Sequence, residues 1–361
     1  MKTILLRPKE ILDEPFSRVF EPLQGNRGAE GFYGRGWLFA LRDVLREKGY
    51  DFKTIDLGDW DTIRKAEKIL IMGFHNDEYY RRCLDESLED KMVYFEVEFR
   101  VNKEGNETEG GYAPATYTSA FGKVLTWEKD IIDNKRVFYI QRPNNWYKGK
   151  LSNLPFQDRK LCVMAYTNKD LQVRGELYSE RKRAILFFQE QVPTEFDLYG
   201  TGWTRSIRRY IRRKLGMNVD EQREFHQSHI ARFLLGEKDY SKCWQGWADN
   251  VYDTYSRYKF VVIYENVSAR GAVSNKLFDC LQAGCVPIYL GATDIEDIVP
   301  LDCFVDKRKY SYEELLHEIM EMSEEDWGSM IECGKTFLAS KAGRRHFEKD
   351  WAREFVEVLL K

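Results

Sequence analysis

The sequence has no long apolar run. Before Arg7 and Pro8, its N-terminus offers only the short segment "TILL" at residues 3–6. A membrane-spanning helix needs roughly 20 apolar residues, and a signal peptide needs a core of about 7 to 15. We therefore expect a cytoplasmic protein without a leader or a membrane anchor.

The sequence also lacks closely spaced cysteine pairs and any pattern of metal ligands. Its seven cysteines are Cys83, Cys162, Cys243, Cys280, Cys285, Cys303 and Cys333. Their odd number and the absence of a CxxC pair indicate reduced thiols in a cytosol. Among five histidines, only His226 and His229 have one-face helical spacing, and no cysteine or carboxylate pattern accompanies them. No metal site is therefore expected.

A strong net charge is missing too. Lys and Arg number 56 against 59 Asp and Glu, which gives a net charge of -3 and argues against a nucleic-acid partner. One local segment, "WTRSIRRYIRRKLG" at 203–216, is strongly basic. A helix there would carry five arginines in one stripe: Arg205, Arg208, Arg209, Arg212 and Arg213.

Such a charged stripe is most often a solvated helix face. Because no carboxylate is interleaved, however, the five arginines repel one another, and an anionic partner would relieve that repulsion. Acidic lipid headgroups or a phosphorylated glycolipid acceptor have the required charge. We therefore hypothesise that this helix brings the protein to the inner face of a membrane.

What the sequence does contain is a regular alternation of short apolar runs and amphipathic segments. Apolar runs that predict strands lie at 3–6, 68–74, 92–99, 123–127, 136–141, 161–166, 196–200, 258–264 and 286–290. Helical spacing recurs between them, for example at 176–191. This pattern predicts an α/β protein with mostly parallel sheets, and 361 residues suffice for two domains.

The predicted domain boundary lies in the polar stretch 142–160, which is rich in Pro, Asn and Gly. We expect one Rossmann-like domain at 1–150 and a second at 151–345. A final helix in 346–361 would pack back on the first domain. Two such domains would face each other across a cleft, and parallel sheets bind ligands at the carboxyl ends of their strands.

The stretch 264–292, "YENVSARGAVSNKLFDCLQAGCVPIYLGA", carries the clearest chemical signal. Glu265 and Asn266 follow an apolar strand, Ser274 is a good helix N-cap, and Lys276 falls in the first helical turn. The helix dipole disfavours a lysine there, whereas an anion is attracted to the same place. A lone lysine would simply point into water. Together with the strand-end residues, it indicates a bound phosphate.

The segment 258–308 resembles the donor-binding motif of the α-1,3-fucosyltransferase family, glycosyltransferase family 10. That motif reads aromatic-Glu-Asn-Ser, a loop, Asp-Tyr-Val-Thr-Glu-Lys-Leu, then Ala-Gly-x-Val-Pro-x-x-Leu-Gly. Three upstream stretches are also similar to the family: "YFEVEF", "YTNKDLQVRGELYSERKRAI" and "FDLYGTGW". The likeness covers residues 90–340, and residues 258–308 match without a gap.

The resemblance implies a GT-B fold and inverting transfer of L-fucose from GDP-β-L-fucose to a hydroxyl of a glycan. Domain 1–150 would then lie on the acceptor side, and domain 151–345 would bind the donor. Cell-surface polysaccharide or lipopolysaccharide synthesis would be its context, with no cofactor and no essential divalent metal. Lys276 would hold the pyrophosphate and Asn266 would face the nucleotide sugar. A second phosphate ligand would be Arg181, or Arg183 in another helical register. The whole donor-binding set is Arg181, Arg183, Tyr264, Glu265, Asn266, Ser274, Asn275 and Lys276.

An inverting transfer also needs a carboxylate that takes the proton of the attacking hydroxyl. Glu96 and Glu98 lie on one face of the strand end "VYFEVEF". The family's acidic residue aligns with Glu96, so Glu96 is the predicted base. Glu98 is the alternative base, or the neighbour that raises the pKa of the first carboxyl. A solvated strand edge is the simpler reading of the same pair.

The sequence departs from the family motif at two positions. Ala272 stands where the family has tyrosine, and Asn275 stands where it has the glutamate that meets the ribose hydroxyls. Asparagine can accept a hydrogen bond but not as a charged, bidentate partner. Two alternatives therefore stay open: a transferase of the same fold that uses another nucleotide sugar, and an inactive protein that only binds a nucleotide or glycan.

Overall fold

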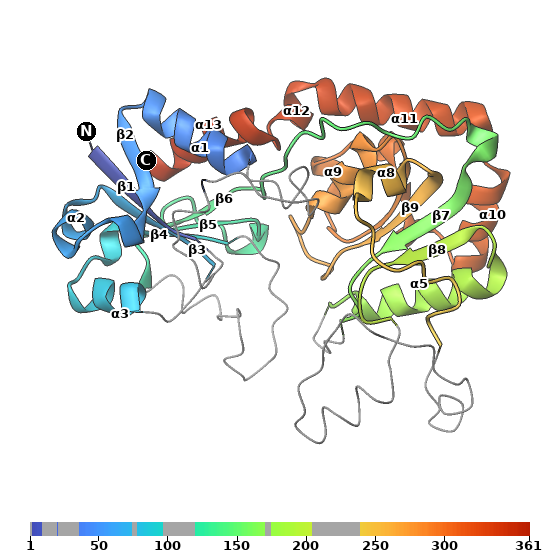
Figure 1. The fold of residues 1–361 in the computed structure, drawn as a ribbon, viewed down its shortest axis with the longest axis horizontal. Helices are drawn as coiled ribbons and strands as arrows, with labels where there is room; N and C mark the ends of the chain where they lie inside the picture. The colour runs from blue at the N-terminus through green and yellow to red at the C-terminus, as the bar shows by residue number, and fades with distance from the viewer. Residues whose placement is uncertain are drawn as a thin grey trace, which may run out of the picture.

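The computed structural model describes residues 2–8, 20, 36–73, 78–96, 120–169, 175–203 and 239–361. Two sheets account for the strands of these residues, and every strand pairing in them is parallel. The first sheet has the order β2-β1-β3-β4-β5-β6 and the second has the order β11-β10-β9-β7-β8. Figure 1 shows the two sheets in separate lobes, each covered by helices.

The first lobe is formed mainly by the N-terminal part of the chain. Its strands are β1 (Lys2–Arg7), β2 (Tyr50–Thr54), β3 (Lys68–Met72), β4 (Met92–Phe95), β5 (Lys123–Thr126) and β6 (Val137–Tyr139). Its helices are α1 (Gly36–Glu47), α2 (Trp60–Lys65) and α3 (Glu78–Asp85), with short 3-10 turns η2 (Ile55–Leu57), η3 (Glu89–Lys91) and η4 (Lys129–Ile131). Alternate residues of β1 serve opposite faces, because Ile4 and Leu6 join one hydrophobic cluster and Leu5 joins another.

The second lobe contains β7 (Lys160–Ala165), β8 (Phe196–Tyr199), β9 (Tyr258–Tyr264), β10 (Val286–Leu290) and β11 (Val305–Asp306). Its helices are α5 (Tyr178–Gln191), α8 (Val251–Tyr255), α9 (Asn275–Gln282), α10 (Tyr312–Glu321), α11 (Glu324–Ala339) and α12 (Lys341–Arg344). The 3-10 turns are η5 (Phe156–Asp158), η6 (Ile295–Asp297), η7 (Leu301–Cys303) and η8 (Lys307–Lys309). Strand β9 is buried along its length, and its residues alternate between the two clusters that cover this sheet.

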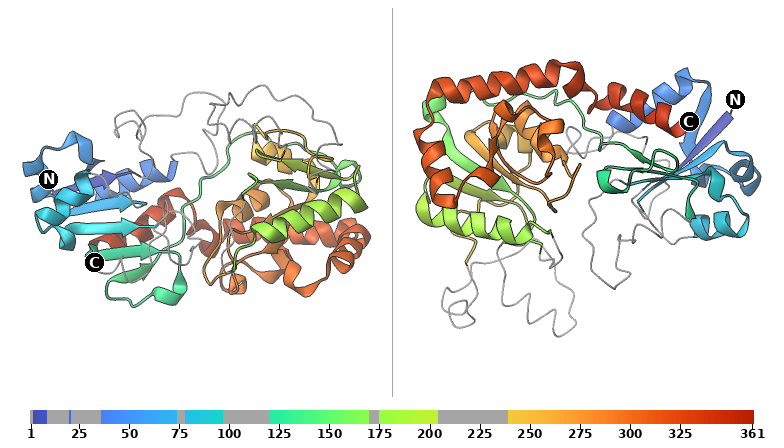
Figure 2. Two further views of the ribbon diagram at one scale, coloured as in Figure 1. Left: turned by 90° about the horizontal axis from the view of Figure 1, so that it is seen from below. Right: turned by 180° about the vertical axis from the view of Figure 1, so that it is seen from behind.

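The last helix, α13 (Glu348–Leu360), lies in the first lobe although it ends the chain (Figures 1 and 2). Its Trp351 and Phe355 are buried in the same cluster as Leu41 of α1. The Phe355 ring lies 5.0 Å from that of Phe95, edge to face. Lys123 Nζ also donates to the Val358 carbonyl at 2.7 Å, which satisfies an otherwise unpaired carbonyl near the helix end. The C-terminal helix is therefore part of the N-terminal core.

The two lobes meet where β5 ends and the loop after β9 begins. Trp127 packs with Val267 and Ala272 in a small hydrophobic cluster. Gly271 has φ +80°, and a Cβ added there would come within 2.2 Å of the Trp127 carbonyl oxygen, so only glycine fits. Lys129 Nζ forms an ion pair with Asp294 at 2.6 Å across the same junction. The strand ends of both sheets are thus held near one another.

Candidate functional site

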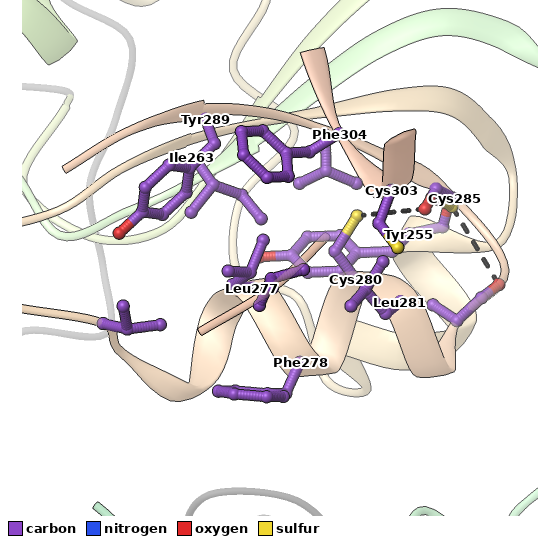
Figure 3. Close-up of a cluster of buried hydrophobic side chains, with 14 of the residues drawn as sticks. Tyr255, Ile263, Leu277, Phe278, Cys280, Leu281, Cys285, Tyr289, Cys303 and Phe304 are labelled. Atoms are coloured by element: carbon purple, nitrogen blue, oxygen red, sulfur yellow. Dashed lines mark hydrogen bonds between the residues drawn. The ribbon is translucent and has the colours of Figure 1, made fainter. Parts of the chain in front are cut away.

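The site is organised by the turn from β9 into α9. Ser274 caps the helix, because its hydroxyl accepts from the Lys276 backbone N–H at 3.4 Å. Helix α9 is anchored through Leu277, Cys280 and Leu281. Figure 3 shows these side chains between the helix and the strands, whereas Phe278 points to the other side. The helix N-terminus is therefore fixed at the carboxyl end of the sheet.

Lys276 is partly buried at this N-terminus. Burial is the main cause that lowers the pKa of its ammonium group to about 8, and the positive charges of Arg181 and Arg142 act in the same direction. The ammonium nitrogen lies 5.6 Å from the centre of the Tyr166 ring. A lysine in this setting gains from a bound anion, because the anion offsets both the desolvation and the repulsion.

Arg181 of α5 lies at the same strand end. Its Nε and Nη2 donate to the Tyr264 carbonyl at 2.9 and 2.6 Å, and Nη2 also donates to Asn266 Oδ1 at 2.8 Å. Its guanidinium carbon is 4.3 Å from the centre of the Tyr166 ring, which places the cation over an aromatic face. Arg181, Asn266 and Lys276 therefore converge on the end of β9.

Arg183 takes a different position. Its side chain is 70% exposed and pairs with Glu180 at 2.6 Å. Two residues along a helix separate side chains by about 200°, so α5 cannot present both arginines to the strand end. The structure therefore brings Arg181, and not Arg183, to the neighbourhood of Lys276.

Two predicted donor residues have inward-facing side chains. Tyr264 is fully buried in the hydrophobic cluster under α5, and it offers its carbonyl to the site. Glu265 is 1% exposed, and its Oε1 accepts from the Ser274 backbone N–H at 2.7 Å. Both residues therefore shape the loop and the cap of α9.

The Asn275 side chain is hydrogen-bonded to Asp279, a carboxylate that the sequence analysis did not single out. Its Nδ2 donates to Asp279 Oδ2 at 2.7 Å, and Tyr252 donates to Asp279 Oδ1 at 2.5 Å. Burial raises the pKa of Asp279 to about 6, although both of these hydrogen bonds act to lower it. The spacing of four residues on one helix could have indicated this contact.

Arg142 is a second residue that sequence reasoning missed. It follows β6, in the stretch interpreted as a linker, and its side chain is buried. It is close enough to Lys276 to act on the lysine's pKa. The neighbouring Gln141 donates from Nε2 to the Gly271 carbonyl at 3.2 Å, so this segment lies against the loop that follows β9. A single arginine in a polar stretch gives no pattern from which such a position could be recognised.

Glu96 lies at the carboxyl end of β4 and is 2% exposed. Its Oε2 accepts from the Thr126 hydroxyl at 2.6 Å, and its backbone N–H donates to the Leu125 carbonyl at 2.9 Å. Glu98 lies outside the described residues, as do His226 and His229. The basic stripe also lies outside them: Arg205, Arg208, Arg209, Arg212 and Arg213.

Two kinds of feature are absent from the described part of the chain. No group of three or more His, Cys, Asp or Glu side chains there is arranged to hold a metal ion. In the same part of the chain, no helix has the length and apolar character needed to cross a bilayer.

Comparison with known proteins bears on the second lobe. Residues 217–329 match the sequence model "Glycosyltransferase family 10 (fucosyltransferase) C-term". This stretch, which is less than half of the chain, is similar to glycosyltransferase family 10. The chain is also similar to a plant protein, the alpha-(1,4)-fucosyltransferase of Arabidopsis thaliana, with 41% identity over 64 residues. That match covers 18% of this chain and only 16% of the plant protein. The expected relationship to this family is confirmed.

Solved structures extend the likeness to both lobes. An alpha1,3-fucosyltransferase aligns with a TM-score of 0.52 at 11% identity, covering 100% of this chain and 90% of its own. Its complex with GDP-fucose aligns with a TM-score of 0.52 at 12% identity, with the same coverage. A trehalose-6-phosphate enzyme from E. coli bound with UDP-2-fluoro glucose gives 0.55 at 9% identity, covering 100% of this chain and 99% of its own. These likenesses concern the fold, and the predicted GT-B architecture is confirmed.

Proposed function

We propose that this protein is an inverting glycosyltransferase that moves L-fucose from GDP-β-L-fucose to a hydroxyl group of a glycan. The observation that carries the proposal is the convergence of Arg181, Asn266 and Lys276 at the end of β9 and the start of α9. Cell-surface polysaccharide or lipopolysaccharide would be the acceptor class. The match of residues 217–329 to a fucosyltransferase family model supports fucose as the transferred sugar.

The two cations would act on the leaving group. When the sugar departs, its bond to the diphosphate breaks and negative charge grows on the diphosphate oxygens. Lys276 sits at a helix N-terminus, and Arg181 is fixed by three hydrogen bonds, so little reorganisation is needed when that charge appears. Such preorganised charge lowers the barrier of the chemical step as well as strengthening donor binding.

Glu96 would be the general base. The carboxylate takes the proton of the acceptor hydroxyl while that oxygen attacks the anomeric carbon from the face opposite the diphosphate, so the configuration inverts. Glu96 comes from the first lobe and the cations come from the second, and the two lobes meet at Trp127 and Gly271. The proposed base and the proposed leaving-group site would therefore lie on opposite sides of the lobe junction.

A nucleotide panel tests donor recognition. We expect GDP to raise the midpoint of thermal unfolding and UDP and CMP to leave it unchanged, because only a bound ligand stabilises the folded state. Release of GDP from GDP-fucose, measured with a panel of glycan acceptors, then tests turnover. Stabilisation by GDP without GDP release for any acceptor would favour the inactive, nucleotide-binding alternative.

Lys276→Ala tests the phosphate contact directly. Loss of a charge-assisted contact should weaken GDP binding about tenfold to a hundredfold in calorimetric titration. Lys335→Ala is the matched control, because Lys335 is an exposed lysine of α11 paired with Glu332 at 3.5 Å. Equal GDP affinity in both variants and the unchanged protein would show that Lys276 does not bind the diphosphate.

A different nucleotide sugar is the second candidate donor, and two observations favour considering it. The Asn275 amide nitrogen is engaged by Asp279, and Ala272 is fully buried against Trp127. Neither side chain therefore offers the charged or aromatic contact that the family motif has at these positions. Stabilisation by UDP or CMP, with none by GDP, would establish this alternative.

We also propose that the five-arginine stripe at 205–213 directs the enzyme to an anionic membrane surface. The support is the sequence alone: five cations at helical spacing and no interleaved carboxylate. Flotation with liposomes that contain anionic lipid should recover the protein at low salt, and replacing the five arginines by glutamine should abolish recovery. Equal flotation of both proteins, or of neither, would refute the proposal.

A further inference from the structure

Thr126 lies directly beside the proposed base. Strands β4 and β5 are parallel neighbours with Phe95 opposite Leu125, so the following residues, Glu96 and Thr126, meet at the carboxyl end of the sheet. The Thr126 hydroxyl donates to Glu96 Oε2 at 2.6 Å. Both side chains are almost completely buried, so water does not compete for this hydrogen bond.

The direction of this hydroxyl is fixed by its surroundings. The Glu128 backbone N–H donates to Thr126 Oγ1 at 3.1 Å, which leaves the hydroxyl hydrogen to point toward the carboxylate. The Thr126 carbonyl accepts from the Ile140 N–H at 2.8 Å, which fixes the backbone on the β6 side. A β-branched side chain has few rotamers, so the hydroxyl has little freedom to turn away.

We propose that Thr126 is the positioning residue of the base, an inference that rests on the proposed function. Thr126 holds the Glu96 carboxylate in place at the strand end, where that carboxylate meets the acceptor hydroxyl. The acceptor O–H bond breaks and its proton goes to the Glu96 carboxylate. The acceptor oxygen bonds to the anomeric carbon, and the bond from that carbon to the diphosphate breaks, with its electron pair leaving on the diphosphate.

The same strand end also fixes the distance to the donor. Trp127 follows Thr126 and packs on Ala272, and its carbonyl lies against Gly271 of the donor-side loop. The hydroxyl that orients the base and the carbonyl that contacts the loop therefore belong to adjacent residues at the end of β5. Thr126 thus sets the base in relation to the site of the leaving group.

A second buried threonine in the same sheet provides a matched control. Thr54 ends β2 and is 0% exposed, and its hydroxyl has no hydrogen-bond partner among the described residues. A threonine-to-valine change there removes a buried hydroxyl of the same lobe without touching Glu96. The pair of variants separates loss of the Glu96 contact from the general effect of the substitution.

The experiment measures kcat and the donor KM from GDP release, with GDP-fucose and the most active glycan of an acceptor panel. Thr126→Val should lower kcat on the order of tenfold to a hundredfold, the effect of losing a hydrogen bond to a charged group. Donor KM and GDP affinity should stay unchanged. Thr126→Ser, which keeps the hydroxyl, should restore most of the rate, and Thr54→Val should match the unchanged protein.

Four results would overturn the inference. These are an unchanged kcat in Thr126→Val, equal losses in the valine and serine variants, loss of GDP affinity together with kcat, and a kcat loss in Thr54→Val as large as that in Thr126→Val. If Thr126→Val does not fold, Thr126→Ala is measured under the same criteria. Two further measurements show which claim has failed. An active Glu96→Gln variant would refute the role of Glu96 as the base. No GDP release by the unchanged protein would refute the proposed function and this inference with it.

Discussion

The lowered pKa of Lys276 leads to a specific pH dependence of donor binding. The free protein loses the lysine's proton around pH 8, because burial and neighbouring cations disfavour the charged form. A bound diphosphate favours the charged form, so the complex keeps the proton to higher pH. Binding therefore takes up a proton, and affinity must fall as the pH rises through 8.

The size of the effect follows from the same value. With a pKa of about 8, Lys276 is about nine-tenths protonated at pH 7 and about one-tenth protonated at pH 9. GDP affinity should therefore fall about tenfold between these pH values, if the complex stays protonated throughout. Calorimetric titration in two buffers of different ionisation enthalpy measures both the affinity and the proton uptake.

Lys276→Arg is the control for this experiment. Arginine keeps its charge across the whole range, so this variant reports the titration of the nucleotide and of other groups. We expect a steeper loss of affinity in the unchanged protein than in the variant, with proton uptake near pH 8 in the former alone. Equal slopes in the two proteins would refute the assignment of Lys276 to the diphosphate.

Three further predictions concern the framework of the site. Arg181→Ala should weaken GDP binding about tenfold or more in calorimetric titration, because a buried charge-assisted contact is lost, whereas Arg183→Ala should bind normally since it removes only a surface ion pair. Gly271→Ala should lower the free energy of unfolding in urea more than the control Gly246→Ala. Both glycines have positive φ, but only a Cβ at position 271 would clash, with the Trp127 carbonyl oxygen. Trp351→Ala should cost about 3 to 5 kcal/mol in the same assay, because it empties the core between α13 and the first sheet.

The strands were predictable because parallel strands buried on both faces are continuous apolar runs. The prediction of a strand at 258–264 coincides with β9, and the prediction at 286–290 coincides with β10. Helix α9 follows from its Ser274 cap and its apolar face, both of which are local signals. Local patterns were therefore enough for the elements and for the position of Lys276.

Contacts between distant segments were not predictable in the same way. An amphipathic pattern shows that a helix buries one face, but it does not show which segment covers that face. An example is the edge-to-face contact between Trp37 and Trp351, whose ring centroids are 5.6 Å apart although the residues lie near opposite ends of the chain. Arg142 lies in the polar stretch that the sequence predicts to be a linker, and no local pattern marks it as a site residue. Only the fold brings it close to Lys276. The sequence alone also does not decide whether Arg181 or Arg183 faces the site. The structure decides it, because Arg181 lies on the buried face of α5 and Arg183 does not.

The departure from the family motif at position 275 can now be separated from the phosphate contacts. Lys276 and Arg181 are held by the helix cap, the Tyr264 carbonyl and Asn266, and none of these contacts involves the Asn275 side chain. The Asn275 amide nitrogen is engaged inside by Asp279, so its carbonyl oxygen is the group left to face a ligand, as a single neutral acceptor. In the proposed donor site, asparagine in place of glutamate would therefore affect which nucleoside is preferred, whereas binding of the diphosphate would depend on other residues. Because the two functions lie on adjacent residues of one helix turn, nucleoside preference could change in this chain while the leaving-group chemistry stayed the same.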